Sequence, residues 1–269
     1  MTSARTQNFP NICRQWRQVR KLSQLDLALA ADVSQRHISW LETGRSHPSR
    51  EMVERLSEAM DIPLRERNVL LHAAGYAAAY HETQLNEPIM APVLDALNYM
   101  LQHHNPLPAV VVDRYWNVKK ANQAADFLLS IGGDPQTFQA HLGAEGELNL
   151  ALLTIHPNGL RQYITNWDQV LPSIIRRLRS ESLTFGDLGI QERFAQYIEL
   201  VGPEGDSESS ASLLPVLPLE LDINGLELSL FSVIATFGTP QDITTDELRI
   251  ETFYPTDAKT EQFFRTHDF

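Results

Sequence analysis

Six side chains that can hydrogen-bond to or stack on a nucleic acid lie in one short stretch of the chain. They are Ser34, Gln35, Arg36, His37, Ser39 and Trp40. Arg36 is the best candidate for reading a base, because a guanidinium can donate two parallel hydrogen bonds to guanine. A phosphate contact or a solvated charge is the alternative for Arg36. The stretch therefore predicts a surface that meets the groove of a DNA duplex.

Residues on either side of this stretch suit the DNA backbone. Gln24 begins an expected helix, and the N-terminus of that helix favours a phosphate. Arg45 and His47 follow in a loop, where they could hold the neighbouring phosphates. His37 suits the backbone better than a base. Trp40 either meets a thymine methyl or a sugar edge, or packs against the following loop.

The spacing of apolar residues from Pro10 to Ala74 predicts five short helices that position these side chains. Ser23 and Ser34 are expected to cap the N-termini of the second and third helices, and Gly44 is expected to end the third.

In the second helix, Leu25, Ala28 and Leu29 are expected to face inward. The small Ala28 lets two helices cross closely, and Val33 and Ile38 then fix the angle of the third helix. The exposed side of that third helix is left free for DNA.

The segment LSQLDLALAADVSQRHISWLETGRSHPS, residues 22–49, resembles the helix-turn-helix of the Xre-type repressors, which include the lambdoid phage repressors. The resemblance covers about the first quarter of the chain. It implies an all-α DNA-binding domain over residues 1–80 that binds a double-stranded DNA operator.

The net charge of −12 is unevenly divided along the chain. Residues 1–80 contain eleven Lys/Arg and eight Asp/Glu, a net +3, whereas residues 81–269 contain eleven and twenty-six, a net −15. Because charges beyond a Debye length of about 8–10 Å are largely screened, the basic first part can still attract phosphates.

The single cysteine, Cys13, permits no internal disulfide, and it is expected to be inert. The N-terminal residues lack the apolar run of a signal peptide, and no segment has about 18 uninterrupted apolar residues. We therefore expect a cytoplasmic, DNA-associated protein that does not enter a membrane.

The second part of the chain begins with an expected connecting helix within residues 81–105. His103 and His104 are adjacent there and so point in different directions. The sequence contains no HExxH or CxxC motif, and we expect no metal site.

Short strands and helices alternate in the rest of the chain. Strands are expected at 109–112, at 116–121 and on both sides of Asn224-Gly225, a dipeptide preferred in type I′ turns. A further strand is expected in ELRIETFYP, residues 247–255, followed by a short helix. The apolar stripe of NWDQVLPSIIRRLRSESL predicts a helix with Arg176, Arg177 and Arg179 on its wet side. Residues 202–212 are expected to form a mobile acidic loop.

The order of strand, Asp113 turn, strand and then Asn122 before a helix resembles the start of a PAS domain. The motifs DRYWNVKKAN, IHPNGLRQYITNW, PVLPL, TFGTPQD and ELRIETFYP together resemble the MmyB-like regulators. These resemblances imply an α+β, PAS-like C-terminal domain over residues 106–269 with an antiparallel sheet. They also imply a ligand-responsive transcription factor whose effector is a small apolar ligand, a fatty acid.

An apolar pocket with a few polar groups at one end would suit an acyl chain with a carboxylate. Arg161 is the first candidate partner for that carboxylate, with pairing to Asp168 as its structural alternative. His156 and Asn122 are further candidates, although the first may only cap a turn and the second a helix. Plausible aromatic walls, each of which could instead be ordinary core, are Trp116, Trp167, Phe231 and Phe237.

Other functions are weighed against this one. The chain has no G-x-S-x-G, Walker loop or paired-carboxylate motif, so we expect no enzyme. A DNA-bound scaffold whose second domain binds a protein partner is the main alternative, and a PAS domain holding haem or flavin is another. We expect no cofactor beyond the effector. We also expect a homodimer, whose two DNA readers the ligand would move relative to each other.

Overall fold

The computed structural model describes residues 8–131, 147–185, 188–201 and 215–269. The chain divides into two compact units. The first contains residues 1–82 with 181–191 and 240–246, and the second contains 83–180, 192–239 and 247–269. The acidic loop expected over 202–212 lies outside the described residues.

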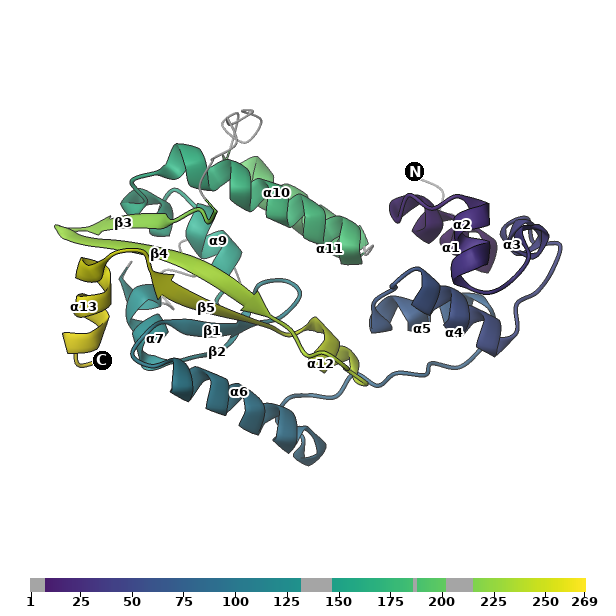
Figure 1. Cartoon of the computed structure of the whole chain (residues 1–269), viewed down its shortest axis with the longest axis horizontal. Helices are drawn as coiled ribbons and strands as arrows, with labels where there is room; N and C mark the ends of the chain where they lie inside the picture. Colours follow the sequence, from purple (N-terminus) through teal and green to yellow (C-terminus); the bar gives the residue numbers. More distant parts are fainter. Residues whose placement is uncertain (1–7, 132–146, 186–187, 202–214) are drawn as a thin grey trace. The chain divides into compact units, whose positions relative to one another are not determined.

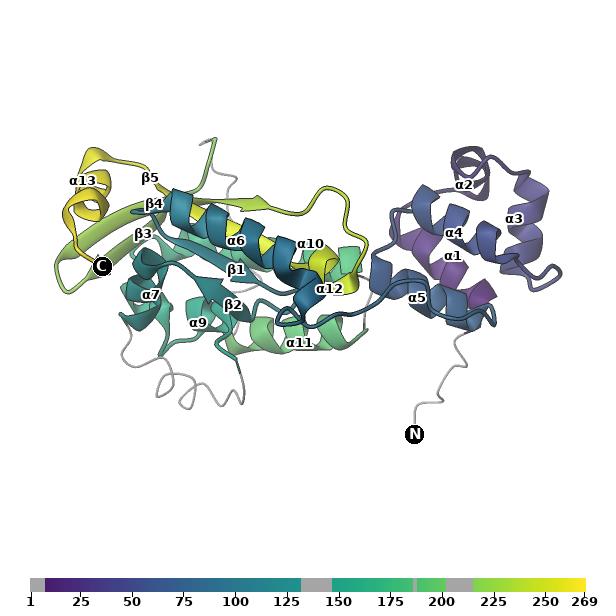
Figure 2. The same cartoon turned by 90° about the horizontal axis from the view of Figure 1, so that it is seen from below.

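The first unit begins with the five expected helices, which form a compact group (Figure 2). They are α1 (Phe9–Val19), α2 (Gln24–Ala30), α3 (Gln35–Glu42), α4 (Arg50–Ala59) and α5 (Leu64–Ala73). Their core contains the buried side chains of Trp16, Ile38, Leu41 and Leu56. The all-α prediction for this part of the chain is confirmed.

Polar side chains set the ends of these helices as predicted. Ser23 and Asp26 form a reciprocal capping box at the start of α2, and the Ser34 hydroxyl accepts from the backbone N–H of His37 at the start of α3. Gly44 follows α3 with a φ of 72°, a conformation that costs glycine little. Local chemistry thereby sets the first residues of α2 and α3 and the chain direction after α3.

The predicted inward face of α2 is only partly right. Ala28 is buried, but Leu25 and Leu29 are 50% and 72% exposed, and Leu27 is buried instead. A seven-residue helix with leucines at alternate positions does not define one apolar face, so packing against neighbouring helices selects Leu27.

The second unit contains a five-stranded antiparallel sheet of order β2-β1-β5-β4-β3 (Figure 1). Its strands are β1 (Ala109–Val112), β2 (Val118–Ala121), β3 (Leu219–Ile223), β4 (Leu226–Ala235) and β5 (Arg249–Pro255). Asn224 and Gly225 have positive φ in the β3–β4 turn, as a type I′ hairpin requires. The predicted α+β class with an antiparallel sheet is confirmed.

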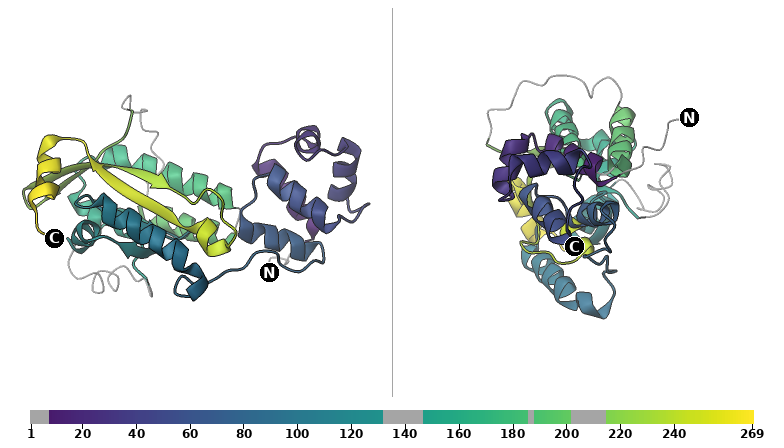
Figure 3. Two further views of the ribbon diagram at one scale, coloured as in Figure 1. Left: turned by 60° about the horizontal axis from the view of Figure 1, so that its bottom comes forward. Right: turned by 90° about the vertical axis from the view of Figure 1, so that its right-hand side faces the viewer.

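Helices lie on both faces of this sheet (Figures 1 to 3). Helix α6 (Ala91–His104) follows the short helix η1 (Pro88–Met90), and its Leu97 and Leu101 pack against Val111 and Ile250. The opposite face is lined by helices α7 (Gln123–Ser130), α9 (Leu150–Ile155) and α10 (Trp167–Phe185). The remaining helices are η2 (Leu160–Tyr163), α11 (Leu188–Val201), α12 (Ile243–Glu247) and α13 (Ala258–Thr266).

The second strand begins later than predicted, at Val118 instead of Trp116. The Asp113 carboxylate accepts hydrogen bonds from the backbone N–H groups of Tyr115 and Asn117, which closes a turn around Trp116. Trp116 has a φ of 70°, outside the extended region, and its side chain is buried. This turn removes Trp116 from the strand but keeps its ring in the interior.

Candidate nucleic-acid interface and ligand cavity

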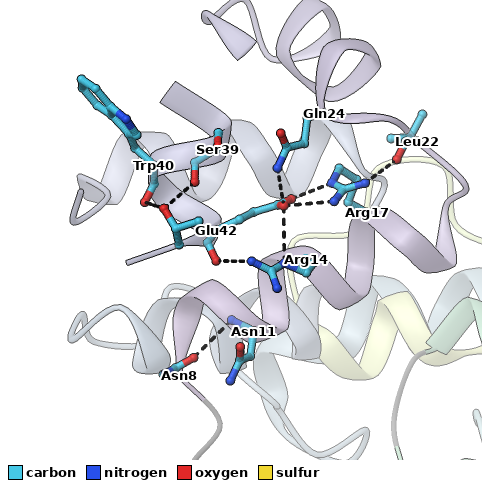
Figure 4. Close-up of polar contacts among 10 residues, drawn as sticks. Asn8, Asn11, Arg14, Arg17, Leu22, Gln24, Ser39, Trp40 and Glu42 are labelled. Atoms are coloured by element: carbon cyan, nitrogen blue, oxygen red, sulfur yellow. Dashed lines mark hydrogen bonds and ion pairs between the residues drawn. The ribbon is translucent and has the colours of Figure 1, made fainter. Parts of the chain in front are cut away.

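Helix α3 presents the predicted DNA-reading residues together. Gln35 and Arg36 are exposed, while His37 and Ser39 are partly buried. The Arg36 guanidinium carbon lies 4.5 Å from the centre of the Trp40 ring, one helical turn away. Figure 4 shows the Trp40 ring turned away from the polar cluster behind α3. The helix therefore carries a cation stacked on an aromatic surface, and both groups can contact DNA.

The flanking candidates have local partners. The Ser34 side chain is used as the cap of α3, and the His47 ring donates from Nδ1 to the carbonyl of Pro48 at 3.0 Å. Gln24 donates from Nε2 to Glu42 Oε2 at 2.9 Å. Arg45 is exposed in the loop after α3. Phosphate contacts by Gln24, Arg45 and His47 remain predictions.

Glu42, the last residue of α3, is the centre of a polar cluster that sequence reasoning missed (Figure 4). Its buried carboxylate receives two hydrogen bonds from Arg17 on α1, at 2.6 and 3.0 Å, and one from Gln24 on α2. Arg14 donates to the backbone carbonyl of Glu42 at 2.7 Å. The cluster joins α1, α2 and α3. Sequence reasoning gave Glu42 no role because it stands in Leu-Glu-x-Gly, between Leu41 and Gly44, a pattern that is typical of an ordinary helix end.

Electrostatics keep the Glu42 carboxyl ionised. Burial by itself would raise its pKa, but hydrogen bonds from Arg17 and Gln24, with the charges of Arg17 and Arg14, outweigh burial and hold the pKa below its ordinary value. The hydrogen bonding between Arg17 and Glu42 raises the pKa of the Arg17 guanidinium. The pair is therefore charged on both sides throughout the neutral range.

The second unit contains a partly open cavity of about 210 Å³ between the sheet and helices α7, α9 and α10. Its walls are mainly apolar side chains from both the sheet and the helices, among them Val110, Leu129, Leu150, Val170, Ile174, Leu178, Leu221, Leu230 and Phe253. The polar residues Thr154, Ser173 and Ser232 also line it. An apolar enclosure with a few polar groups is the form that small-molecule sites usually take.

The residues that line the cavity include an ion pair. Arg177 on α10 lies 3.3 Å from Glu251 on β5, measured from Nη1 to Oε1, and its guanidinium carbon lies 3.9 Å from the centre of the Trp116 ring. Glu251 is only 4% exposed. Its second oxygen, Oε2, is buried and accepts no hydrogen bond from any of the residues that the structure describes.

Two predicted ligand residues line this cavity, Trp116 and Phe231. The Phe231 ring also stacks on that of Tyr254. Phe237 packs beside the core under α6, and Trp167 packs beside the core that includes Val170 and Leu230. Neither Phe237 nor Trp167 is among the cavity residues.

The polar ligand candidates have other roles in the structure. Asn122 caps α7 and donates to the carbonyl of Leu107, while Arg161 lies 4.8 Å from the centre of the Trp167 ring. His156 accepts at Nδ1 from the backbone N–H of Asn158, and partial burial lowers its pKa. The cavity residues do not include Asn122, Arg161 or His156.

Arg177 corrects the prediction that all three arginines of α10 lie on its wet side. Arg176 and Arg179 are exposed, but Arg177 is partly buried and lines the cavity. It follows Ile174 by three positions and precedes Leu178, so it borders the apolar stripe of α10. Its position beside the stripe could therefore have identified Arg177 from the sequence. Nothing in the sequence identified Glu251, because both faces of the sheet are covered by helices and the strand then lacks a clear alternation of apolar and polar residues.

The described parts of the chain contain no cluster of three or more His, Cys, Asp or Glu side chains arranged for a metal ion. His104 instead hydrogen-bonds through Nε2 to the carbonyl of Phe253. None of the described helices is long and apolar enough to span a bilayer.

Comparison with protein-family models finds a helix-turn-helix domain at residues 14–67 and an MmyB-like transcription regulator ligand binding domain at residues 93–199. A comparison with curated proteins finds no match. The first match contains α3 and the Glu42 cluster, and the second contains Trp116, Arg177 and most of the helical wall of the cavity. The chain therefore joins an Xre-type helix-turn-helix DNA-binding domain to an MmyB-like ligand-binding domain, the composition of a ligand-responsive transcription regulator.

Proposed function

We propose that the protein binds a DNA operator through α3 and holds a small apolar effector of the fatty-acid class in the cavity of its second unit. The observation that supports this most directly is the apolar-lined cavity beside the sheet. The effector is a ligand and not a substrate, and it is released unchanged. The sheet order β2-β1-β5-β4-β3 and the position of the cavity also support a PAS-like description of this unit.

The size of the cavity limits the effector. A volume of about 210 Å³ holds about seven water-sized groups at ~30 Å³ each. At ~0.8 kcal/mol for each buried methylene, an aliphatic chain of that size contributes about 6 kcal/mol before ordering costs are subtracted.

The effector controls DNA binding through a homodimer in this proposal. Two recognition helices on one face of DNA must lie about 34 Å apart, one helical turn, to enter successive major grooves. An effector that binds one arrangement of the two helices more tightly shifts the dimer toward it. DNA affinity then depends on effector concentration.

The test is native mass spectrometry of the purified full-length chain, followed by organic extraction and identification of what it carries. We expect one aliphatic molecule per subunit, a dimer mass, and a changed affinity for a selected operator duplex when octanoate or octanamide is added. A chain that carries nothing, and that none of a series of aliphatic compounds stabilises, would contradict the effector and favour a protein partner for the second unit.

A further inference from the structure

We propose that residues 240–246, which lie between β4 and β5, couple the cavity to the DNA-binding helices, and that Asp246 is the positioning residue of this coupling. This segment belongs to the first unit, although the strands on either side of it belong to the second (Figure 1). The inference rests on the proposed function, because it concerns how an effector in the cavity changes operator binding.

The start of α5 is held by this segment. Pro63, the N-cap residue of α5, has no side-chain acceptor for the free N–H groups at the start of the helix. The first of them, the N–H of Leu64, donates to Oδ2 of Asp246 at 3.0 Å, across 182 positions of sequence. A carboxylate at this end of a helix also interacts favourably with the helix dipole. A residue from between two strands of the sheet therefore caps a helix of the first unit.

The segment also holds the chain that follows α5. The Ile243 N–H donates to the carbonyl of His81 at 2.8 Å, and His81 forms a parallel bridge with Asp242. Within the segment, the Asp242 carboxylate accepts from the backbone N–H of Thr244 at 2.9 Å, in the first turn of α12. The segment thus has a defined conformation, and it contacts the first unit both at the start of α5 and beyond its end.

Packing links α5 to the helix that carries the candidate DNA-contact residues. Leu70 and Leu71 of α5 are buried in the same core cluster as Ile38 and Leu41 of α3. Because such a core is close-packed, neighbouring helices must accommodate a displacement of any one of them. A change in the position or stability of α5 can therefore reach α3.

On its other side, the segment is joined by short stretches of chain to strands that line the cavity. Phe231 on β4 and Phe253 on β5 are cavity residues, and the two strands are paired with each other. Residues 236–239 connect β4 to the segment, and residues 247–248 connect the segment to β5. A shift of these strands around a bound molecule therefore acts on the segment directly.

Two consecutive carboxylates have partners in different units. Asp246 accepts from Leu64 in the first unit, and Glu247 forms a buried ion pair with Arg114 in the second, at 2.5 Å from Oε1 to Nη1. Arg114 lies in the turn around the cavity residue Trp116. Because the two carboxylates are adjacent in the chain, a movement of this turn that shifts Glu247 also pulls on Asp246.

The experiment replaces Asp246→Ala in the full-length protein and measures operator affinity by fluorescence anisotropy with and without octanoate. We expect octanoate to change the operator Kd of the wild type by about fivefold or more, and that of Asp246→Ala by about twofold or less. Asp246 is not among the cavity residues, so calorimetry without DNA should give the same octanoate affinity for both proteins. The matched control is Asp257→Ala, which removes the cap of α13 in the second unit and should keep the wild-type ratio.

A measurement on the wild type alone keeps the inference testable if Asp246→Ala does not fold. Octanoate should change the hydrogen exchange of the backbone amides in the first turn of α5, where Leu64 donates to Asp246. Because coupling is reciprocal, the operator should also change the octanoate affinity of the wild type by the same factor as octanoate changes operator affinity.

The outcomes separate the two proposals. If octanoate changes operator affinity equally in the wild type and in Asp246→Ala, or leaves exchange in the first turn of α5 unchanged, the coupling role is wrong and the proposed function stands. If Asp257→Ala loses the ratio as well, the loss reflects general destabilisation and the role of Asp246 is also wrong. If octanoate does not bind, or binds without changing the operator affinity of the wild type, the proposed effector control fails, and this inference with it.

Discussion

The carboxylate of Glu42 and the guanidinium of Arg17 face each other through two hydrogen bonds, of 2.6 and 3.0 Å, across the interface between α1 and α3. The Glu42 side chain is fully buried and that of Arg17 is 14% exposed. Because Glu42 is the last residue of α3, this pair fixes the end of the helix that carries Arg36 and Trp40. The pair therefore holds the end of α3, the helix with the candidate DNA-contact residues, against α1.

Replacing Glu42→Gln should lower the free energy of unfolding of the first unit by about 3 kcal/mol, because it leaves the Arg17 charge without a buried partner. The control is Glu54→Gln, which breaks the exposed Arg50–Glu54 pair and should cost no more than about 1 kcal/mol. Both losses of unfolding free energy can be measured by urea unfolding, with hydrogen exchange of the backbone amides in α1 to α3 as the probe. Equal costs would show that the Glu42 pair does not stabilise the unit.

The same carboxylate predicts how the first unit responds to acid. The pKa of Glu42 is lower in the folded chain than its ordinary value of about 4.3, so its contribution to stability is present above that pH. The contribution is lost as the pH falls through the lower folded pKa. The stability difference between wild type and Glu42→Gln should therefore shrink below about pH 4.3. A difference that stays constant down to pH 2 would contradict the assignment.

Replacing Arg36→Ala should weaken binding to a selected operator by about 1–3 kcal/mol and relax the base preference at one position. Arg55→Ala on α4 removes the same charge away from α3 and serves as the control. Fluorescence anisotropy with operator and scrambled duplexes measures both. If Arg36→Ala weakens both duplexes equally, Arg36 contacts a phosphate and does not read a base.

Replacing Ser173→Phe should fill the cavity and prevent effector binding without loss of DNA binding to the bare operator. Ser173 lines the cavity from α10, so a phenyl group there occupies the space that an aliphatic chain requires. Gln169→Phe, at an exposed position of the same helix, is the matched control and should bind the effector normally. Calorimetry with octanamide distinguishes them. Normal binding by Ser173→Phe would place the ligand elsewhere.

Cys13 should resist thiol reagents until the first unit unfolds. Burial raises the pKa of its thiol to about 12, helped by the charge of Glu42, so the reactive thiolate is scarce at neutral pH. Labelling with a chromogenic disulfide at pH 8 should be slow in the native protein and fast in urea. Rapid labelling of the native chain would revive a redox role for this cysteine.

Features determined by a few neighbouring residues could be predicted from the sequence. Ser23 and Ser34 cap helices because a hydroxyl satisfies free backbone N–H groups, whatever the rest of the chain does. Asn224 and Gly225 form a hairpin turn because they tolerate positive φ. The five helices and the exposed face of α3 follow from such local patterns and from hydrophobic periodicity, whereas the antiparallel sheet as a whole was implied by the resemblance to PAS domains and MmyB-like regulators.

Tertiary structure alone decided which side chains become partners across long sequence distances. Arg17 and Glu42 are 25 positions apart, and Arg177 and Glu251 are 74 apart, so no local pattern links them. A buried charge is tolerated only where the fold brings its counter-charge to it, and that depends on packing of whole helices and strands. The effector class was implied by the resemblance of the sequence to the MmyB-like regulators, whereas the apolar cavity proposed to hold it forms only when strands of the sheet pack against α7, α9 and α10.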